Sequence, residues 1–340
     1  DGWGLWTDDG VGVNQGAAYA KVIPDGGDGT FVVWEEYVTA PPSIGILRMT
    51  DAGWSAWGTF NDYVIAGTSH TPMIVPDGAG GAVVGYRHYH SGSSYSVRGQ
   101  RIDSDGDLLW ASDEVSSGYG TFGAPIVADG TGGGIWVWQD GLDAVVQRMD
   151  GAGDLQWGSS GWDAFPNMAG ACTDTRIVTD GAGGAIAVTI VADDYIYAQH
   201  IHANGALAWG SAGVQVYAGS TVIPGMEIAS DGSGGAYIAW EDDRDYGTSG
   251  RNIYAQHVDA TGSVQWAAAG VVICDETGNQ QDVQISATGA HSAVIAWSDA
   301  RNFGTTSYDI YAQAIHQDGS IGDPPFGLLS VTATQNDIFR

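Results

Sequence analysis

The chain has few basic residues. Forty acidic residues stand against eleven Lys and Arg in a total of 340, and Lys21 is the single lysine, so the formal net charge is −29. Such a surface repels nucleic acids and anionic membranes, and we expect neither as a partner. It attracts divalent cations, although an acidic surface adapted to secretion or to salt is the simpler explanation.

Cysteine, helical periodicity and long apolar runs are equally scarce. No segment keeps a helical spacing of apolar residues, and no run approaches the length of a membrane span, so we predict no membrane insertion. The two cysteines, Cys172 and Cys274, fall at places that do not correspond between the repeats described below, so a disulfide stays an open question. The sequence also lacks a phosphate-binding loop, a nucleophile motif and a redox cysteine pair.

What the chain has instead is a repeat of about fifty residues that occurs six times. Each unit opens with an apolar triplet and a turn, and an aromatic residue usually stands nine positions after the turn residue. The turn residues are Asp25, Asp77, Asp129, Asp180, Asp231 and Thr288, and the residues nine positions later are Trp34, Tyr86, Trp138, Thr189, Trp240 and Trp297.

A second marker repeats in step with the first: a glycine four residues before a tryptophan. These tryptophans are Trp6, Trp57, Trp110, Trp157, Trp209 and Trp266. Two independent markers with one period indicate a solenoid or a propeller. We interpret the repeated aromatic residues as structural markers that pack between neighbouring sheets.

The best-preserved unit, residues 226–277, divides into four short strands. Residues 226–230 and 236–240 flank a glycine-rich hairpin, residues 252–259 follow a polar loop, and the fourth strand lies around residues 264–273. Four strands per unit, repeated six times, predict an all-β fold. We expect a six-bladed β-propeller with four antiparallel strands in each blade.

The two ends of the chain compete for one position in this scheme. Gly10 to Val13 match the fourth strand at Gly213 to Val216, so we expect residues 1–16 to be the outer strand of the last blade and to close the ring. The propeller then spans residues 1–323. Residues 324–340 are left as a tail or linker, which is able to add a strand to another subunit.

Two repeats carry a motif that resembles a known group of proteins. Trp297, Asp299 and Arg301 are followed by Asp309-Ile-Tyr-Ala-Gln313, and residues 240–244 with 252–256 repeat the pattern with Asn252 in place of the first Asp. This pattern resembles tandem propeller repeats of large secreted bacterial surface proteins. The resemblance implies an extracellular or cell-surface location and the propeller architecture, and it carries over no catalytic residues.

The polar loops after the second strand of each unit hold the candidate ligand-binding residues, because these loops share one face of a propeller. The candidates are Glu35, Glu36, Arg87, Asp242, Arg244, Asp299 and Arg301. Structural ion pairs that tie blades together are the simpler interpretation of the Asp and Arg two positions apart. The alternative is a polar ring that binds sugar or a carboxylate ligand. Arg87, Arg244 and Arg301 are the only support for a sialidase-like arginine clamp.

Metal binding has two candidate motifs. Asp103, Asp105 and Asp107 alternate in a glycine turn, a spacing that suits calcium, and solvated turn residues are the competing explanation. His88 and His90, like His200 and His202, place two imidazoles on one side of a strand, as a zinc site requires. His200, however, occupies a repeat position that is filled by Arg48, Arg101, Arg148 and His257 elsewhere, which favours a structural role.

These observations favour a non-catalytic, extracellular structural or adhesive propeller of a cell-surface or filament-forming protein. Its partners would be further copies of itself, joined head to tail through a terminal strand, or other surface proteins and glycans. A carbohydrate-binding, lectin-like propeller is the alternative, and a glycan-degrading enzyme comes after both. No cofactor is indicated apart from the calcium considered above.

Overall fold

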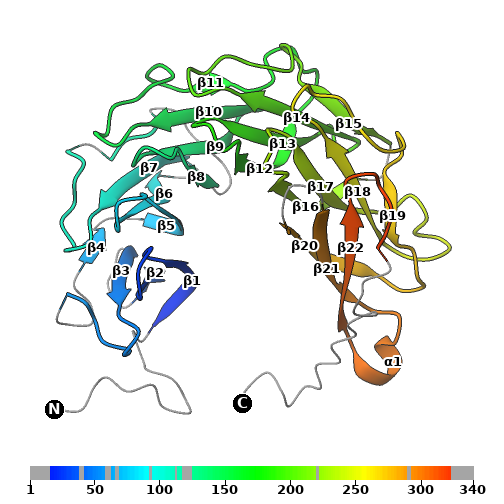
Figure 1. Ribbon diagram of the computed structural model, residues 1–340, viewed down its shortest axis with the longest axis horizontal. Helices are drawn as coiled ribbons and strands as arrows, with labels where there is room; N and C mark the ends of the chain where they lie inside the picture. Colours follow the sequence, from blue (N-terminus) through cyan, green and yellow to red (C-terminus); the bar gives the residue numbers. More distant parts are fainter. Residues whose placement is uncertain are drawn as a thin grey trace. The chain divides into compact units, whose positions relative to one another are not determined.

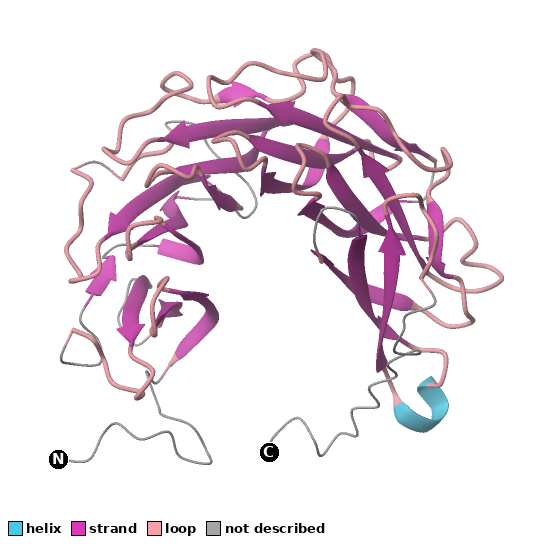
Figure 2. Cartoon of the chain, in the orientation of Figure 1, coloured by secondary structure: helices cyan, strands magenta, loops and turns pink. Residues whose placement is uncertain are grey.

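The computed structural model describes residues 16–37, 42–57, 63–65, 69–91, 94–111, 113–116, 125–219, 222–288 and 292–322. Within these ranges nearly all regular structure is β-strand, and the single helix, α1 (Phe303–Thr306), has four residues (Figure 2). The all-β prediction is confirmed. None of the described residues forms a helix that is long and apolar enough to cross a membrane.

The strands form six antiparallel sheets and the chain divides into two compact units (Figure 1). The first unit carries sheets 1 to 3 and the second carries sheets 4 to 6, apart from Leu142–Ala144 and Ala203–Gly205, which each group with the other unit. Consecutive strands pair within every sheet, so each sheet is a meander built from one sequence repeat.

The strands of the first unit have the following bounds. Sheet 1 contains β1 (Ala17–Pro24), β2 (Thr30–Glu36), β3 (Ser43–Met49) and β4 (Tyr63–Ile65). Sheet 2 contains β5 (Ser69–Pro76), β6 (Ala82–Ser91) and β7 (Ser94–Ile102). Sheet 3 contains β8 (Ile126–Ala128), β9 (Gly134–Asp140), β10 (Asp143–Met149) and β11 (Trp162–Asp163).

The second unit repeats this plan. Sheet 4 contains β12 (Cys172–Thr179), β13 (Ala185–Val191), β14 (Tyr195–Ile201) and β15 (Val214–Ala218). Sheet 5 contains β16 (Val222–Ser230), β17 (Ala236–Asp242), β18 (Asn252–Val258) and β19 (Val271–Cys274). Sheet 6 contains β20 (Gln280–Ala287), β21 (Ser292–Asp299) and β22 (Asp309–His316).

The strand count agrees with the sequence prediction only in part. Sheets 1, 3, 4 and 5 have four strands, whereas sheets 2 and 6 show three among the described residues. Closure by residues 1–16 lies outside the described residues except for Gly16, as does Trp6. Residues 323–340, which include the predicted tail, also lie outside them. The six-bladed ring and its closing strand therefore stay predictions.

The turn aspartates form the first hairpin of the first five repeats. Oδ1 of Asp25 accepts the backbone N–H groups of Gly27 at 2.8 Å and Gly29 at 3.0 Å, which fixes the turn. Asp77, Asp129, Asp180 and Asp231 accept the corresponding two N–H groups in their own turns. The residue after each Asp is a glycine with positive φ, a conformation that costs other residues energy.

A β-bulge interrupts the first strand in five sheets. The register of the first two strands shifts at the same repeat position in sheets 1, 2, 4, 5 and 6. The bulge residue has positive φ and stands six positions before the turn residue: Tyr19, Thr71, Asp174, Gly225 and Asp282. The bulge turns backbone N–H groups out of the sheet, where they need another acceptor.

The marker tryptophans lie in the core and connect neighbouring sheets. Trp34, Trp138, Trp240 and Trp297 on the second strands are buried. The indole N–H of each second-marker tryptophan within the described ranges donates to a backbone carbonyl about fifty residues later, at 2.9 to 3.4 Å. The donors Trp57, Trp110, Trp157, Trp209 and Trp266 bind Ser104, Gly151, Ala203, Ala260 and Gln317. Each indole thereby links one repeat to the next.

Candidate functional site

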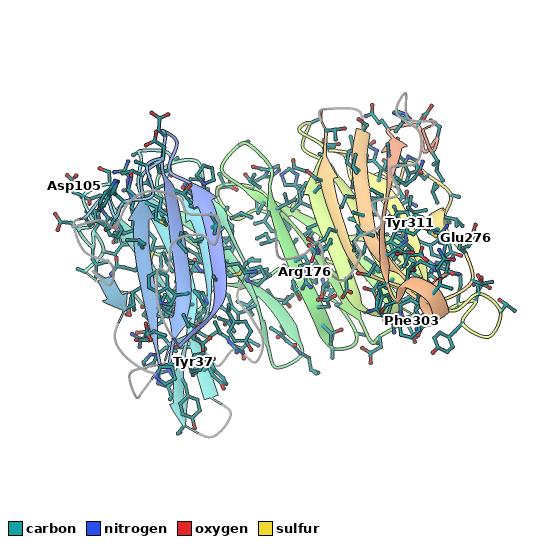
Figure 3. All side chains as sticks on the ribbon, turned by 90° about the horizontal axis from the view of Figure 1, so that it is seen from below. Tyr37, Asp105, Arg176, Glu276, Phe303 and Tyr311 are labelled. Atoms are coloured by element: carbon teal, nitrogen blue, oxygen red, sulfur yellow. The ribbon has the colours of Figure 1, made fainter. Side chains whose placement is uncertain are left out.

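Three loops of the second unit form one continuous surface. They comprise residues 242–252 of sheet 5, residues 275–280 between sheets 5 and 6, and residues 299–309 of sheet 6. The N–H of Gly278 donates to the carbonyl of Ser249 at 2.8 Å, and the N–H of Ala300 donates to the carbonyl of Asn279 at 2.9 Å. We call this surface the sheet 5–6 loop face, and Figure 3 labels Glu276, Phe303 and Tyr311 in this part of the second unit.

Asp242 and Arg244 form the base of the first loop. The guanidinium of Arg244 binds both oxygens of Asp242, at 2.8 and 2.5 Å, and its carbon lies 3.7 Å from the centre of the Tyr254 ring. Burial alone would raise the pKa of Asp242, but the hydrogen bonds from Arg244 outweigh it and hold the pKa below its ordinary value. The pair is therefore an ionised internal strut.

Asp299 and Arg301 repeat this arrangement in the sheet 6 loop. Arg301 binds the two carboxylate oxygens at 3.0 and 2.6 Å and stacks on Tyr311 at 4.0 Å. Its Nη2 also donates to Sγ of Cys274 at 3.2 Å. Burial raises the pKa of the Cys274 thiol to about 11, so this cysteine stays protonated at neutral pH.

Glu241 lies one position before the Asp242 strut and has a different role. Its Oε1 accepts the N–H of the bulge residue Asp282 at 2.7 Å, while its Oε2 pairs with Arg251 at 3.0 Å. Arg251 also reaches Asp243 at 3.2 Å. Burial raises the pKa of Glu241 above its ordinary value in spite of these partners.

The same loops carry exposed aromatic side chains. Tyr246 and Phe303 are each 57% exposed and Tyr308 is 38% exposed. The rings of Phe303 and Tyr308 meet edge to face at 5.2 Å, and the hydroxyl of Tyr308 donates to Gln281 at 3.4 Å. Exposed rings on loops that also hold fixed polar groups are typical of a surface that binds a ligand with both apolar and hydroxyl faces.

The predicted ligand-binding residues of the first unit make contacts within and between sheets 1 and 2. Glu35 accepts the N–H of the bulge residue Thr71 at 3.0 Å and contacts Nδ1 of His70 at 2.5 Å. Glu36 accepts the indole N–H of Trp34 at 3.4 Å. Arg87 donates to the Thr71 hydroxyl at 3.0 Å and lies 4.6 Å from the centre of the Tyr95 ring.

Of the predicted ligand-binding set, the structure therefore brings Asp242, Arg244, Asp299 and Arg301 onto one surface of the second unit. Arg244 binds Asp242 and Arg301 binds Asp299, so neither guanidinium is available to clamp the carboxylate of a ligand. This removes the support for a sialidase-like arrangement at Arg244 and Arg301. Both cysteines are buried, and they form no disulfide.

The predicted calcium motif forms a tight turn. Oδ1 of Asp103 accepts the N–H groups of Asp105 at 3.0 Å and Asp107 at 2.9 Å, as Asp150 and Asp259 do in the matching turns. Within the described ranges, the one group of three or more His, Cys, Asp or Glu side chains with closely spaced ligand atoms is Asp180, His200 and His202. Calcium binding at Asp103, Asp105 and Asp107 stays a prediction.

Sequence reasoning missed Tyr246, Phe303 and Tyr308, because exposed aromatic residues in loops follow no period. Loop length is the sequence feature that distinguishes the repeats carrying these residues. The segment between the marker tryptophan and the next strand spans residues 241–251 in the fifth repeat but only 139–142 in the third. The longer loops of sheets 5 and 6 are the ones that carry these rings.

Comparison with known proteins shows similarity at the level of fold. Neither a protein-family model nor a curated protein matches this sequence. Among solved structures, the BP39L lectin from Burkholderia pseudomallei matches with a TM-score of 0.55 and 10% identity over 87% of this chain and 80% of the lectin. An ulvan lyase of polysaccharide lyase family PL25, bound to -[GlcA(1-4)Rha3S]-, matches with a TM-score of 0.55 and 11% identity over 94% of this chain and 84% of the lyase. The chain thus has an all-β, propeller-like fold.

Proposed function

We propose that this protein is a non-catalytic carbohydrate-binding propeller whose ligand binds at the sheet 5–6 loop face. The observation that carries the proposal is the trio of exposed rings, Tyr246, Phe303 and Tyr308, on the loops that also hold the Asp242–Arg244 and Asp299–Arg301 struts. The likeness of the fold to a lectin and to a polysaccharide lyase supports carbohydrate as the ligand class.

The chemistry of the surface suits a sugar. Aromatic faces pack against the apolar C–H faces of a pyranose ring, while nearby polar groups exchange hydrogen bonds with its hydroxyl groups. The struts fix the loops before binding, because each pairs a buried carboxylate with a stacked guanidinium. Preorganised loops lower the entropy cost of holding a weakly apolar ligand.

Binding without catalysis is favoured by the state of the acidic groups. Glycoside hydrolysis needs two carboxyl groups that are free to act as acid and as base or nucleophile. Asp242 and Asp299 are each tied to an arginine, and Glu241 and Asp243 share Arg251. These groups serve the loops rather than a bond-breaking step.

The ligand-binding proposal is tested with a glycan array followed by calorimetry on the strongest binder. The double variant Phe303→Ala with Tyr308→Ala should weaken binding about 5- to 150-fold, because each lost ring contact contributes roughly 0.5–1.5 kcal/mol. The matched control is Tyr195→Ala, since Tyr195 on β14 is 39% exposed and Tyr308 is 38% exposed. Wild-type affinity in the double variant, or equal loss in the control, would refute this site. Release of reducing ends from the bound glycan would refute the non-catalytic part.

The structural or adhesive role remains a second candidate because of one observation at sheet 6. Residues 310–312 of β22 have no strand partner on their outer side among the described residues, whereas the matching residues 253–255 of β18 pair with β19. An open strand edge accepts an added strand. Deleting residues 324–340 should then reduce the particle size measured by light scattering. Unchanged assembly would remove those residues from such a mechanism.

A further inference from the structure

We infer that sheet 4 carries a zinc site formed by Asp180, His200 and His202. One ligand atom from each of these three side chains lies within 4.8 Å of the other two. Asp180 belongs to the turn between β12 and β13, and the two histidines stand at and just after the end of β14. The site lies apart from the loops proposed above for carbohydrate and does not depend on that proposal.

Comparison between the repeats shows that this group is more than a copy of the common plan. In sheets 1 to 3 the turn aspartate pairs with an arginine, Arg48, Arg101 or Arg148. Each of those arginines also donates Nη1 to a backbone carbonyl, of Ser104, Gly151 or Ala203. In sheet 4 the imidazole of His200 replaces the guanidinium, with Nε2 2.9 Å from Oδ2 of Asp180.

Sheet 5 supplies the closest internal comparison. His257 pairs there with Asp231 at 2.9 Å, but two positions later stands Asp259, whose carboxylate accepts the N–H groups of Thr261 and Ser263. In sheet 4 the corresponding residue is His202. Among the sheets in the described ranges, only sheet 4 therefore adds a second imidazole to the pair of turn carboxylate and strand imidazole.

Burial and exposure suit a site that a metal ion can enter. The side chains of Asp180 and His200 are 4% and 9% exposed, so the surrounding sheet holds both in place. His202 is exposed, and its ring centre lies 4.7 Å from that of His200. Nδ1 of His200 is buried without a hydrogen-bond partner, so the protein's own hydrogen bonds do not fully satisfy this imidazole. His257 shares this last feature, which makes the added His202 the distinguishing element.

The chemistry of the three ligands selects the metal. Two imidazoles and a carboxylate suit zinc, with water as a fourth ligand, whereas calcium prefers an all-oxygen set. Tetrahedral zinc with bonds of about 2.0–2.1 Å places its ligand atoms roughly 3.3 Å apart. Nε2 of His200 and Oδ2 of Asp180 are already 2.9 Å apart, so a small separation of this pair and a rotation of the exposed His202 would complete the geometry.

The test is a titration of the full, metal-stripped chain with Zn²⁺ by calorimetry, and with Co²⁺ by visible absorption. Millimolar Ca²⁺ and Mg²⁺ are kept present, because the acidic surface binds divalent ions without specificity. We expect one equivalent of Zn²⁺ per chain and the absorption bands of tetrahedral Co²⁺. Loss of an outer-shell partner costs about 10–100-fold in affinity, so His202→Asn and Asp180→Asn, which remove direct ligands, should each cost at least that.

The matched control is His88→Asn, which disrupts the other close histidine pair, His88 and His90, whose ring centres are 5.1 Å apart. It should leave stoichiometry and affinity unchanged. His202 is exposed, so His202→Asn should keep the wild-type melting temperature, which separates a lost ligand from a lost fold. Absence of saturable binding in excess Ca²⁺, wild-type affinity in His202→Asn, or a loss in His88→Asn equal to that in His202→Asn would each overturn the site.

Discussion

At the scale of single residues, each second-marker indole in the described part of the chain makes one hydrogen bond to the following repeat. Trp209 is 8% exposed and donates its indole N–H to the carbonyl of Ala260 at 3.2 Å. Since the ring is buried between sheets 4 and 5 of the same unit, it contributes both apolar contact and this one directional bond.

Replacing the indole of Trp209 tests the value of that bond. Trp209→Phe keeps an aromatic ring but leaves the carbonyl of Ala260 without its donor, so we expect a loss of about 1–3 kcal/mol in the free energy of unfolding. Trp54→Phe is the control, because Trp54 is 45% exposed and its change should stay within about 0.5 kcal/mol. Urea denaturation followed by circular dichroism measures both, and equal midpoints for the two variants would contradict this role.

Glu35 and Glu241 occupy the same repeat position, yet their pKa values are shifted in opposite directions. Burial tends to raise both, but hydrogen bonds from Tyr37, Thr71 and His70 bring the pKa of Glu35 below its ordinary value of 4.5. For Glu241 burial prevails over Arg251, and the pKa lies above 4.5. Both glutamates accept the N–H of a bulge residue, but ionisation is favoured by the fold at Glu35 and disfavoured at Glu241.

These shifts predict opposite pH dependence for two isosteric variants. Ionisation of Glu35 stabilises the wild type as the pH rises to about 4.5. Glu35→Gln cannot ionise, so its melting temperature should decrease relative to that of the wild type over this pH range. Ionisation of Glu241 destabilises the fold as the pH rises above about 4.5, so the melting temperature of Glu241→Gln should rise relative to that of the wild type above this pH. Calorimetric melting curves would contradict this if both differences moved in the same direction.

At the scale of elements, the bulge in the first strand is the least predictable feature of the repeat. Tyr19, Thr71, Asp174, Gly225 and Asp282 share its conformation but no side-chain chemistry, so no residue pattern marks it. Three of the five also share a backbone role: the N–H groups of Thr71, Gly225 and Asp282 each donate to a carboxylate of the preceding sheet. The bulge is therefore fixed by packing between sheets.

A pair of substitutions at Asp282 tests the strain at this bulge. Asp282 has a φ of 57° and an exposed side chain, so glycine should relieve about 1–2 kcal/mol of left-handed strain and lose roughly 0.5–1 kcal/mol through added freedom of the unfolded chain. We expect Asp282→Gly to be neutral or slightly stabilising and Asp282→Ile to be destabilising by about 1–3 kcal/mol. Urea midpoints in the reverse order would show that the backbone is not strained there.

The sequence predicts the hairpins and the strand order well because their causes are local. An aspartate followed by glycine fixes each turn within five residues, and the apolar strands follow from it. The Asp242–Arg244 and Asp299–Arg301 struts were likewise predictable, since both partners lie two positions apart. Contacts such as Asp180 with His200, or Glu241 with Asp282, join residues twenty or more positions apart, and only the fold brings them together.

At the scale of the whole molecule, we expect the net charge to decide which glycans bind at the proposed site. A formal charge of −29 surrounds any ligand with negative potential, so a neutral glycan should bind more tightly than a sulfated or uronic-acid glycan of the same length. Raising the salt concentration from about 0.01 to 0.15 M shortens the Debye length from about 30 to 8 Å and should narrow this difference. Calorimetry at both salt concentrations checks it, and tighter binding of the acidic glycan at low salt would contradict the prediction.

The most direct measurement is a crystal structure of the chain with the best array glycan bound. We expect sugar density packed on Phe303 and Tyr308, within reach of Tyr246, with the Asp242–Arg244 and Asp299–Arg301 struts unchanged. Density located only on other sheets, or a glycan cleaved in the crystal, would contradict it.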